Sequence, residues 1–421
     1  MKIKSLDMRI FTALPEAREC HAMKPIEHER GGREMKIYKT LAFGIITCVL
    51  MALIVGVGPG SDRVRAEEPV KIGVLIPLTG ASAFGGKKEL IGIQIAIDEI
   101  NQAGGVLDRK LEIIVEDTES RPKAAMDGIH KLVDVNNVPL VIGCHNSSST
   151  IPSATYAQSR EVNQISIAST SPDIRKIGPY HFAACATDEV MGAELVKLAI
   201  KDTGKNEFGI LVMNDAYGAG LGNVMRKAIE ASGGKVLSEV KYELNKSDYR
   251  AELQRLFAPK PPIILSVAWA EMSRVIQKQA YELGLFETVK DTWYSAYFAD
   301  SVEAAIPETI EGRKGLDIAS PKGERFTEFQ AKYAEHTKNK DEIVSWYQAA
   351  AYDAARIAAL AIEMADSTDS NAINKALPEA FSTYQGVSNP DMAVDEDGVQ
   401  KTQIFQSYVF RNGKVEVYDA K

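Results

Sequence analysis

The sequence predicts an α/β fold with two lobes, each built on a parallel sheet. From Val70 onward, short apolar runs rich in β-branched residues alternate with longer segments of helical periodicity. The runs are apolar throughout, which is typical of strands in a parallel sheet that helices cover on both faces. The alternation comes in two successive series, before and after residue 189, so we expect two α/β lobes.

The first series contains five expected strands, at residues 71–77, 111–117, 140–144, 164–169 and 181–185. Between the first two, residues 90–103 are expected to form a helix, because isoleucines and a leucine recur at helical spacing up to the pair Gly104-Gly105, a C-terminal cap signal. Alternating isoleucines in this segment would also fit a strand, but its length and the glycine pair favour the helix.

The second series follows the same rhythm. Its expected strands are residues 208–214, 235–242, 262–268, 292–297 and 315–319, and its helices 189–202, 220–232, 248–257 and 271–284. The C-terminal part changes to helices at 323–337 and 343–365. A hairpin follows, for which Asn412-Gly413 supplies the tight turn.

The composition is that of a folded protein of two or three compact units. The chain has 421 residues, 45% of them hydrophobic and 25% charged, and a formal net charge of -8. Such an apolar chain is not disordered, and its length suits domains of about 100 to 200 residues. Because no block of Lys and Arg interrupts the acidic balance, the composition argues against a nucleic acid or an anionic membrane as partner.

The N-terminal region has the pattern of an export signal. A basic start at residues 35–39 precedes the uncharged stretch 41–57, which Gly58, Pro59 and Gly60 interrupt before Val64-Arg65-Ala66, a short-residue cleavage signal. We expect translation to start at Met35 and residues 1–66 to be removed. A membrane anchor is the alternative, but a span needs about 20 apolar residues.

Two cysteines, Cys144 and Cys185, lie beyond this cleavage point at the ends of predicted strands. In an oxidising compartment they could form a disulfide, or they could remain buried thiols. The sequence leaves both possibilities open.

Polar residues follow two of the predicted strands, where ligands bind in open parallel sheets. After residue 143 comes Cys144-His145-Asn146-Ser147-Ser148-Ser149-Thr150, with Pro152 expected to open a helix, and the next strand leads into Ala168-Ser169-Thr170. Hydroxyl and N–H groups at a helix N-terminus favour a bound anion, although a serine there can also be a simple N-cap. We expect the two loops to converge on one anionic group.

Aromatic residues gather at the other strand ends, namely Phe84, Tyr217, Trp269, Tyr294, Tyr297 and Phe298. Of these, Tyr294 is expected to belong to the core. A crevice with an anion-binding wall and aromatic walls suits a small organic acid with an apolar side.

The sequence does not favour an enzyme. The glycines at 218, 220 and 222 lack the dinucleotide-binding spacing, and no G-x-S-x-G motif is present. The histidines His130, His145, His181 and His336 are scattered rather than spaced as metal ligands. We therefore expect no catalytic residue, no metal and no cofactor.

Taken together, these motifs identify a resemblance to a known family. The exported chain opens with VKIGVLIPLTG at 70–80, continues with GIQIAIDEIN at 92–101 and has a glycine pair at 104–105. In this order and spacing it resembles the type I periplasmic binding proteins of branched-chain amino-acid ABC transporters, over essentially all of 69–421. The resemblance implies two Rossmann-like lobes joined by three crossovers that close over a ligand by hinge motion. The expected boundaries are 69–188 with 319–398, and 189–318 with 399–421.

The resemblance also implies a ligand site. The family's carboxylate-binding residues correspond to Ser147, with Ser148 as neighbour, and to Ala168 and Thr170. Its aromatic positions correspond to Phe84 and Tyr217, and the expected site further includes Trp269, Tyr297 and Phe298.

The ammonium side of the family's site does not carry over. Where amino-acid-binding members have an acidic residue, this chain has Tyr297-Phe298-Ala299. Because an unpaired buried ammonium is unfavourable, either Asp300, Glu271 or Asp215 takes that role or the ligand lacks an amino group. A branched or aromatic amino acid and an amino-free acid both remain open.

The functional expectation is a monomeric periplasmic solute receptor. It would deliver a small carboxylate to the membrane permease of an ABC importer. A receptor domain of the same fold that senses a ligand for a signalling pathway is the alternative.

Overall fold

The computed structural model describes residues 68–268, 270–302, 305–319, 321–340 and 344–419. The predicted signal peptide and its cleavage site lie outside these residues. Within them, no helix combines the length and the hydropathy that crossing a membrane would require.

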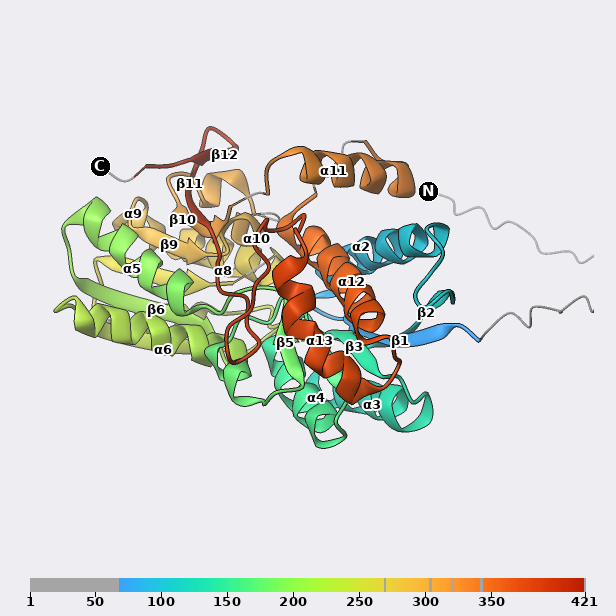
Figure 1. The fold of residues 1–421 in the computed structure, drawn as a ribbon. Coiled ribbons are helices and arrows are strands. Elements are labelled where there is room, and N and C mark those ends of the chain that lie inside the picture. The colour runs from blue at the N-terminus through green and yellow to red at the C-terminus, as the bar shows by residue number, and fades with distance from the viewer. Residues whose placement is uncertain (1–67, 269, 303–304, 320, 341–343, 420–421) are drawn as a thin grey trace, which may run out of the picture. The chain divides into compact units, whose positions relative to one another are not determined.

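The first sheet is parallel and five-stranded, in the order β2-β1-β3-β4-β5 (Figure 1). Its strands are β1 (Val70–Ile76), β2 (Leu111–Asp117), β3 (Leu140–Gly143), β4 (Asn163–Ser166) and β5 (His181–Ala183). Strands β3, β4 and β5 are buried at every position, as expected of strands that helices cover on both faces, although β4 contains the polar residues Asn163, Gln164 and Ser166. All five predicted strands of the first series are present.

The second sheet has seven strands in the order β12-β11-β10-β9-β8-β6-β7. Five are parallel: β6 (Glu207–Met213), β7 (Lys235–Tyr242), β8 (Ile263–Val267), β9 (Trp293–Ala296) and β10 (Lys314–Ile318). The predicted hairpin forms β11 (Phe405–Arg411) and β12 (Lys414–Val417), which add to the sheet in the antiparallel sense. Asn412 and Gly413 both have positive φ, as the tight turn requires.

Helices cover the two sheets. Those of the first half are α2 (Ala83–Gln102), α3 (Pro122–His130), the π-helical turn η1 (Lys131–Val135), α4 (Ser147–Ser159) and the 3₁₀ turn η2 (Pro172–Lys176). Those of the second half are α5 (Glu189–Thr203), α6 (Ala216–Ala231), α7 (Arg250–Phe257), α8 (Ala270–Glu282), α9 (Phe286–Val289), α10 (Phe298–Val302) and η3 (Pro307–Thr309). The C-terminal helices are α11 (Glu324–Thr337), α12 (Trp346–Ala365) and α13 (Ser370–Thr383).

The C-terminal helices return to the first sheet. Helix α12 lies beside α2 (Figure 1), and α13 contacts β4. The close approach of α2 and α12 requires Gly92, because a Cβ there would lie 2.4 Å from the carbonyl oxygen of Gln348. The chain therefore passes between the sheets three times, after β5, after β10 and before β11, as the resemblance implied.

Helix α4 differs from the sequence-based expectation, and the short helices α3, α9 and α10 have no predicted counterpart. Helix α4 begins at Ser147, not at Pro152, which lies inside it. Proline tolerates helical φ, and its missing N–H removes only one hydrogen bond near the helix start. Helix α13 has no counterpart among the predicted helices, and it contains Pro378.

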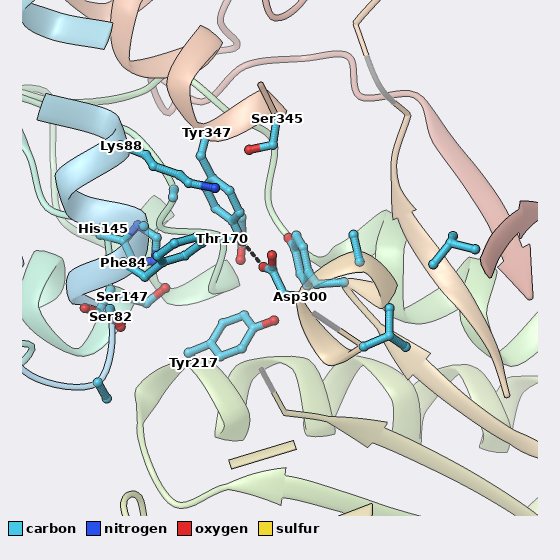
Figure 2. Close-up of a pocket in the computed structure, with 18 of the residues that line it drawn as sticks. Ser82, Phe84, Lys88, His145, Ser147, Thr170, Tyr217, Asp300, Ser345 and Tyr347 are labelled. Atoms are coloured by element: carbon cyan, nitrogen blue, oxygen red, sulfur yellow. Dashed lines mark hydrogen bonds between the residues drawn. The ribbon is translucent and has the colours of Figure 1, made fainter. Parts of the chain in front are cut away.

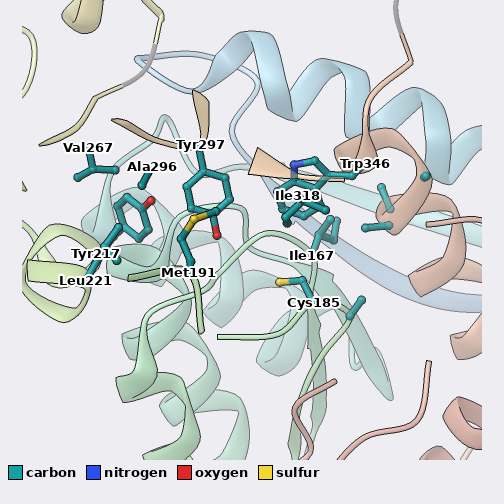
Figure 3. Packing of buried hydrophobic residues seen from close by; sticks show 14 of the residues in the cluster. Ile167, Cys185, Met191, Tyr217, Leu221, Val267, Ala296, Tyr297, Ile318 and Trp346 are labelled. Atoms are coloured by element: carbon teal, nitrogen blue, oxygen red, sulfur yellow. The ribbon is translucent and has the colours of Figure 1, made fainter. Parts of the chain in front are cut away.

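One buried apolar cluster continues from the first sheet to the second (Figure 3). It includes Cys185 and Ile167 from the first half and Tyr217 and Tyr297 from the second. Tyr294 is also in this core, as predicted. The two cysteines are free thiols: Cys144 contacts the hydroxyl of Ser153, and Cys185 donates to the carbonyl of Ser169.

Candidate ligand-binding site

A cavity of about 510 Å³ lies at the carboxyl ends of strands from both sheets (Figure 2). Its first-half lining comes from the loop before α2, from α2 itself and from the loops after β3 and β4. Its second-half lining comes from α6, the end of β9, α10 and the β11–β12 hairpin. The N-terminus of α12 adds Ser345 and Tyr347.

Seven of the predicted site residues line this cavity: Phe84, Ser147, Ala168, Thr170, Tyr217, Tyr297 and Asp300. They come from five separate segments, and the fold brings them together because parallel strands end at the same edge of each sheet.

Ser147 is the first residue of α4, so its side chain and the first free N–H groups of that helix face the cavity together. Its hydroxyl oxygen accepts a hydrogen bond from the backbone N–H of Ser171 at 3.2 Å. The hydroxyl proton of Ser147 therefore has no role in this bond and can be donated to a ligand oxygen.

Asp188 connects the two sides of the cavity, although it is not among the lining residues. Its two carboxylate oxygens accept hydrogen bonds from the hydroxyls of Thr170 and Tyr297, each at 2.8 Å. Asp188 is 1% exposed and precedes α5, on the first segment that runs between the sheets. Burial raises the pKa of Asp188 to about 7, against the two hydrogen bonds, which lower it.

The bonds to Asp188 determine what Thr170 and Tyr297 offer a ligand. Each hydroxyl uses its only proton toward the carboxylate, so its lone pairs remain for a donor. Tyr297 also has a φ of 50°, in the left-handed region that is unusual for a bulky residue. Such outliers cluster at ligand sites, where the surrounding structure holds them.

Asp300 supplies an acidic side chain to the cavity. Its Oδ2 atom accepts a hydrogen bond from the hydroxyl of Tyr347 at 2.5 Å (Figure 2). Burial raises the pKa of Asp300, while the bond from Tyr347 and the charges of His145 and Lys88 lower it.

His145 and Lys88 give the cavity a basic wall. Nδ1 of His145 lies 2.7 Å from Oε1 of Glu89, which is fully buried on α2. Burial lowers the pKa of His145, but the charge of Glu89 and its hydrogen bond raise this pKa by more, so the net change is an increase. The ammonium of Lys88 lies 4.0 Å from the centre of the Phe84 ring.

The remaining predicted residues do not line the cavity as described. Ser148, on the first turn of α4, is not among the lining residues, and Phe298 is fully buried against Ile310 and Phe410. Tyr297, with its left-handed backbone, lies between the end of β9 and the start of α10 at Phe298, so Tyr297 faces the cavity while Phe298 packs into the core. The prediction of Phe298 as a site residue is therefore not supported by its position.

Three further candidates have different outcomes. Asp215 caps α6, where it accepts from the backbone N–H of Gly218 at 2.8 Å, and it does not line the cavity. Trp269 and the side chain of Glu271 lie outside the described residues.

Sequence reasoning missed Lys88, Asp188 and Tyr347. A lysine on an amphipathic helix usually faces solvent, so nothing in the sequence marks Lys88. Tyr347 could have been found from a capping box, because Ser345 and Gln348 have the spacing that starts a helix. Such a signal places Tyr347 at a helix start, but not at this cavity.

The sequence profile of the periplasmic binding proteins matches residues 69–414. The chain belongs to this family. A relative with the same domain is the leucine-, isoleucine-, valine-, threonine- and alanine-binding protein of Pseudomonas aeruginosa, 26% identical over 354 residues, which cover 82% of this chain and 90% of that protein.

Two solved structures share this fold. A leucine-binding protein from Thermotoga maritima has a TM-score of 0.73 at 24% identity, covering 83% of this chain and 98% of that one. A solute-binding protein of an ABC transporter from R. palustris, in complex with 4-hydroxybenzoate, has a TM-score of 0.71 at 19% identity, covering 84% of this chain and 96% of that one. This periplasmic binding protein thus has the type I fold that the sequence predicted.

Proposed function

We propose that this chain is an extracytoplasmic solute receptor that captures a small carboxylate between two closing lobes. The observation that supports this most directly is the cavity itself, where Ser147 and the start of α4 face Tyr217 and Tyr297 from the other sheet. A volume of about 510 Å³ is in the range of small-molecule sites. The receptor would bind its ligand and release it unchanged.

The proposal assigns residues 69–188 with 319–398 to one lobe and 189–318 with 399–421 to the other. The loaded, monomeric receptor would deliver its ligand to the permease of an ABC importer, after export by the signal at residues 35–66. A sensory receptor would use the same cavity, so the ligand chemistry below applies to both roles.

The ligand carboxylate would bind at Ser147. The hydroxyl proton there, the free N–H groups of α4 and the positive end of the helix dipole all favour an anionic oxygen. These groups are neutral, so they hold a carboxylate without another buried charge.

An α-amino acid is the first candidate ligand. Thr170 and Tyr297 donate their hydroxyl protons to Asp188, so at the cavity they can act as acceptors, and Asp300 adds a carboxylate. These three acceptors suit a donor such as an ammonium group. The names of relatives such as the Pseudomonas aeruginosa protein, which binds branched-chain amino acids, support the same choice.

An amino-free aromatic acid is the second candidate. Phe84 is 55% exposed at the cavity and could stack on a ring, with the Lys88 ammonium beside it. The R. palustris neighbour in complex with 4-hydroxybenzoate supports this alternative.

The test is calorimetry with leucine, phenylalanine, 4-methylpentanoate and 4-hydroxybenzoate, after a thermal-shift screen of the same compounds. We expect the double variant Ser147→Ala, Thr170→Ala to weaken the best ligand by about 100-fold or more, because it removes two polar contacts with charged groups. Ser148→Ala is the matched control, since Ser148 lies in the same turn but outside the cavity.

The amino group is tested within the same panel. Leucine binding much more tightly than 4-methylpentanoate, which is leucine without its amino group, supports the amino-acid candidate. Unchanged affinity in the double variant would overturn the proposed site.

A further inference from the structure

Lys88 is a cation of the cavity wall that forms no ion pair with a described residue, although its charge acts on Asp300 across the cavity. It lies on the second turn of α2, is half-buried, and points toward Tyr347 across the cavity (Figure 2). Among the residues that the structure describes, no carboxylate lies within ion-pairing distance of its ammonium, which contacts the Phe84 ring instead. The preceding Lys87 is exposed and outside the cavity, so the position of Lys88 is not simply that of a surface lysine.

His145 places a second basic group on the same wall. Glu89 is fully buried, and in the described part of the chain His145 is its only hydrogen-bond partner. A buried carboxylate requires a compensating charge, so this pair favours the imidazolium form of His145. With Nδ1 bound to Glu89, Nε2 is the nitrogen that a ligand can reach, and in the imidazolium it is a donor.

These two groups differ in charge from the neutral donors at Ser147, which follows His145 by two residues in the chain. Lys88 comes from α2, and the ring of His145 lies against Tyr347, 5.3 Å between ring centres, at the start of α12. The hydroxyl of Tyr347 donates a hydrogen bond to Asp300, so a neutral group already occupies one oxygen of this acid. The cavity wall therefore offers a ligand neutral donors at Ser147 and cationic donors at Lys88 and His145.

We propose that Lys88 and His145 form a second anion subsite, which binds a carboxylate at the far end of the ligand. This inference rests on the proposed function, and it narrows the ligand to a short-chain dicarboxylate, with or without an α-amino group. One carboxylate binds at Ser147 and the other at Lys88 and His145. A ligand with only one carboxylate leaves the Lys88 ammonium unpaired in the closed cavity, which is unfavourable.

The experiment compares matched ligands by calorimetry. Glutamate is compared with norvaline, which has the same carbon chain without the second carboxylate, and glutarate with pentanoate. The first pair carries an α-amino group and the second does not. We expect the dicarboxylate of at least one pair to bind about 10- to 100-fold more tightly than its partner, the range of one charge-assisted hydrogen bond.

Variants at Lys88 then assign the preference to this subsite. Lys88→Met is expected to remove it by weakening the dicarboxylate about 10- to 100-fold while leaving the monocarboxylate unchanged or improved. Lys88→Arg retains the charge and should keep the preference. Lys87→Met is the control, a change of the same type one residue away on an exposed position.

The outcomes separate this inference from the proposed function. Equal binding of the two members of each pair, or an unchanged preference in Lys88→Met, would overturn the second subsite while leaving a carboxylate receptor in place. If no member of either pair and none of the four screening compounds bound, the proposed function itself would fail.

Discussion

The substitution Asp188→Asn is expected to make the protein more stable at pH 8 and at the same time a weaker ligand binder. Asp188 is buried beneath the cavity with hydroxyls of Thr170 and Tyr297 as its partners. Asparagine has nearly the same shape but does not ionise. The substitution therefore isolates the effect of the buried charge.

The magnitude follows from the pKa of this carboxyl group. Its ordinary value is 3.8, and in the folded protein burial raises it to about 7. The folded state then binds the proton more tightly than the unfolded state, so the stabilising effect is complete below the unfolded value and is lost as the pH rises through 7. A difference of about 3 units corresponds to roughly 4 kcal/mol, at 1.36 kcal/mol per unit.

Urea unfolding of wild type and variant between pH 4.5 and pH 8 measures this effect. Between pH 4.5 and pH 8 we expect the unfolding free energy of the variant to rise by about 3 kcal/mol relative to that of wild type, because roughly 2.5 of the 3 units fall within this range. Other buried acids, such as Asp317 and Asp353, titrate in both proteins and cancel. Asp98→Asn, on an exposed position of α2, should show no such trend.

Ligand binding gives the second readout. The two hydroxyls donate to different oxygens of Asp188, and in asparagine one of these two positions is an amide nitrogen, which donates and cannot accept. Thr170 or Tyr297 must then turn its proton toward the cavity and lose its role as acceptor, which should weaken an amino-acid ligand by about 10-fold. Parallel pH profiles of wild type and variant would refute the buried charge, and unchanged affinity would refute the orienting role of Asp188.

Three further outcomes are expected elsewhere in the fold. Arg313 is 1% exposed, stacks on Trp293 with 3.6 Å to the ring centre, and has no hydrogen-bond partner for Nε or Nη2 among the described residues. Because burial strongly lowers the pKa of this guanidinium, Arg313→Met should raise the unfolding free energy by about 1–3 kcal/mol in urea titrations. A lower unfolding free energy in the variant would show that the stacking on Trp293 outweighs the cost of burial. Burial raises the pKa of the Cys144 thiol to about 12 and that of the Cys185 thiol still higher. Neither thiol should therefore react with a thiol reagent in the native protein, and both should react in denaturant. Rapid labelling of either cysteine in the native protein would contradict the buried, unbridged state. Asp353 accepts from two backbone N–H groups and two hydroxyls, so Asp353→Ala should lower the unfolding free energy by about 2–4 kcal/mol, and a neutral result in the same assay would mean that water replaces the lost partner.

The strands were predictable because their signal is local. Each run of consecutive apolar residues needs burial on both faces, and only a sheet between helices provides it. The polar residues that follow β3 and β4 were predictable for a related reason: parallel strands end at a common edge, so Ser147, Ala168 and Thr170 had to lie near one another.

The same local reasoning failed where neighbouring residues diverge. Tyr297 and Phe298 look equivalent in the sequence, yet one faces the cavity and the other the core. The left-handed backbone at Tyr297 sets this direction, and neither residue type announces it. The predicted start of a helix at Pro152 was also wrong, because α4 begins five residues earlier, at Ser147.

The sequence alone thus determined the fold class, the strand order along the chain and the edge at which a ligand site would form, because these depend on periodicity within a few residues. Only the tertiary structure decided the chemistry of the site. Asp188 reaches Tyr297 across 109 positions of the chain, and Asp300 meets Tyr347 across 47. Those contacts set which hydroxyls donate, which accept and which charges stay unpaired, since hydrogen-bond direction and burial depend on neighbours that only folding brings together.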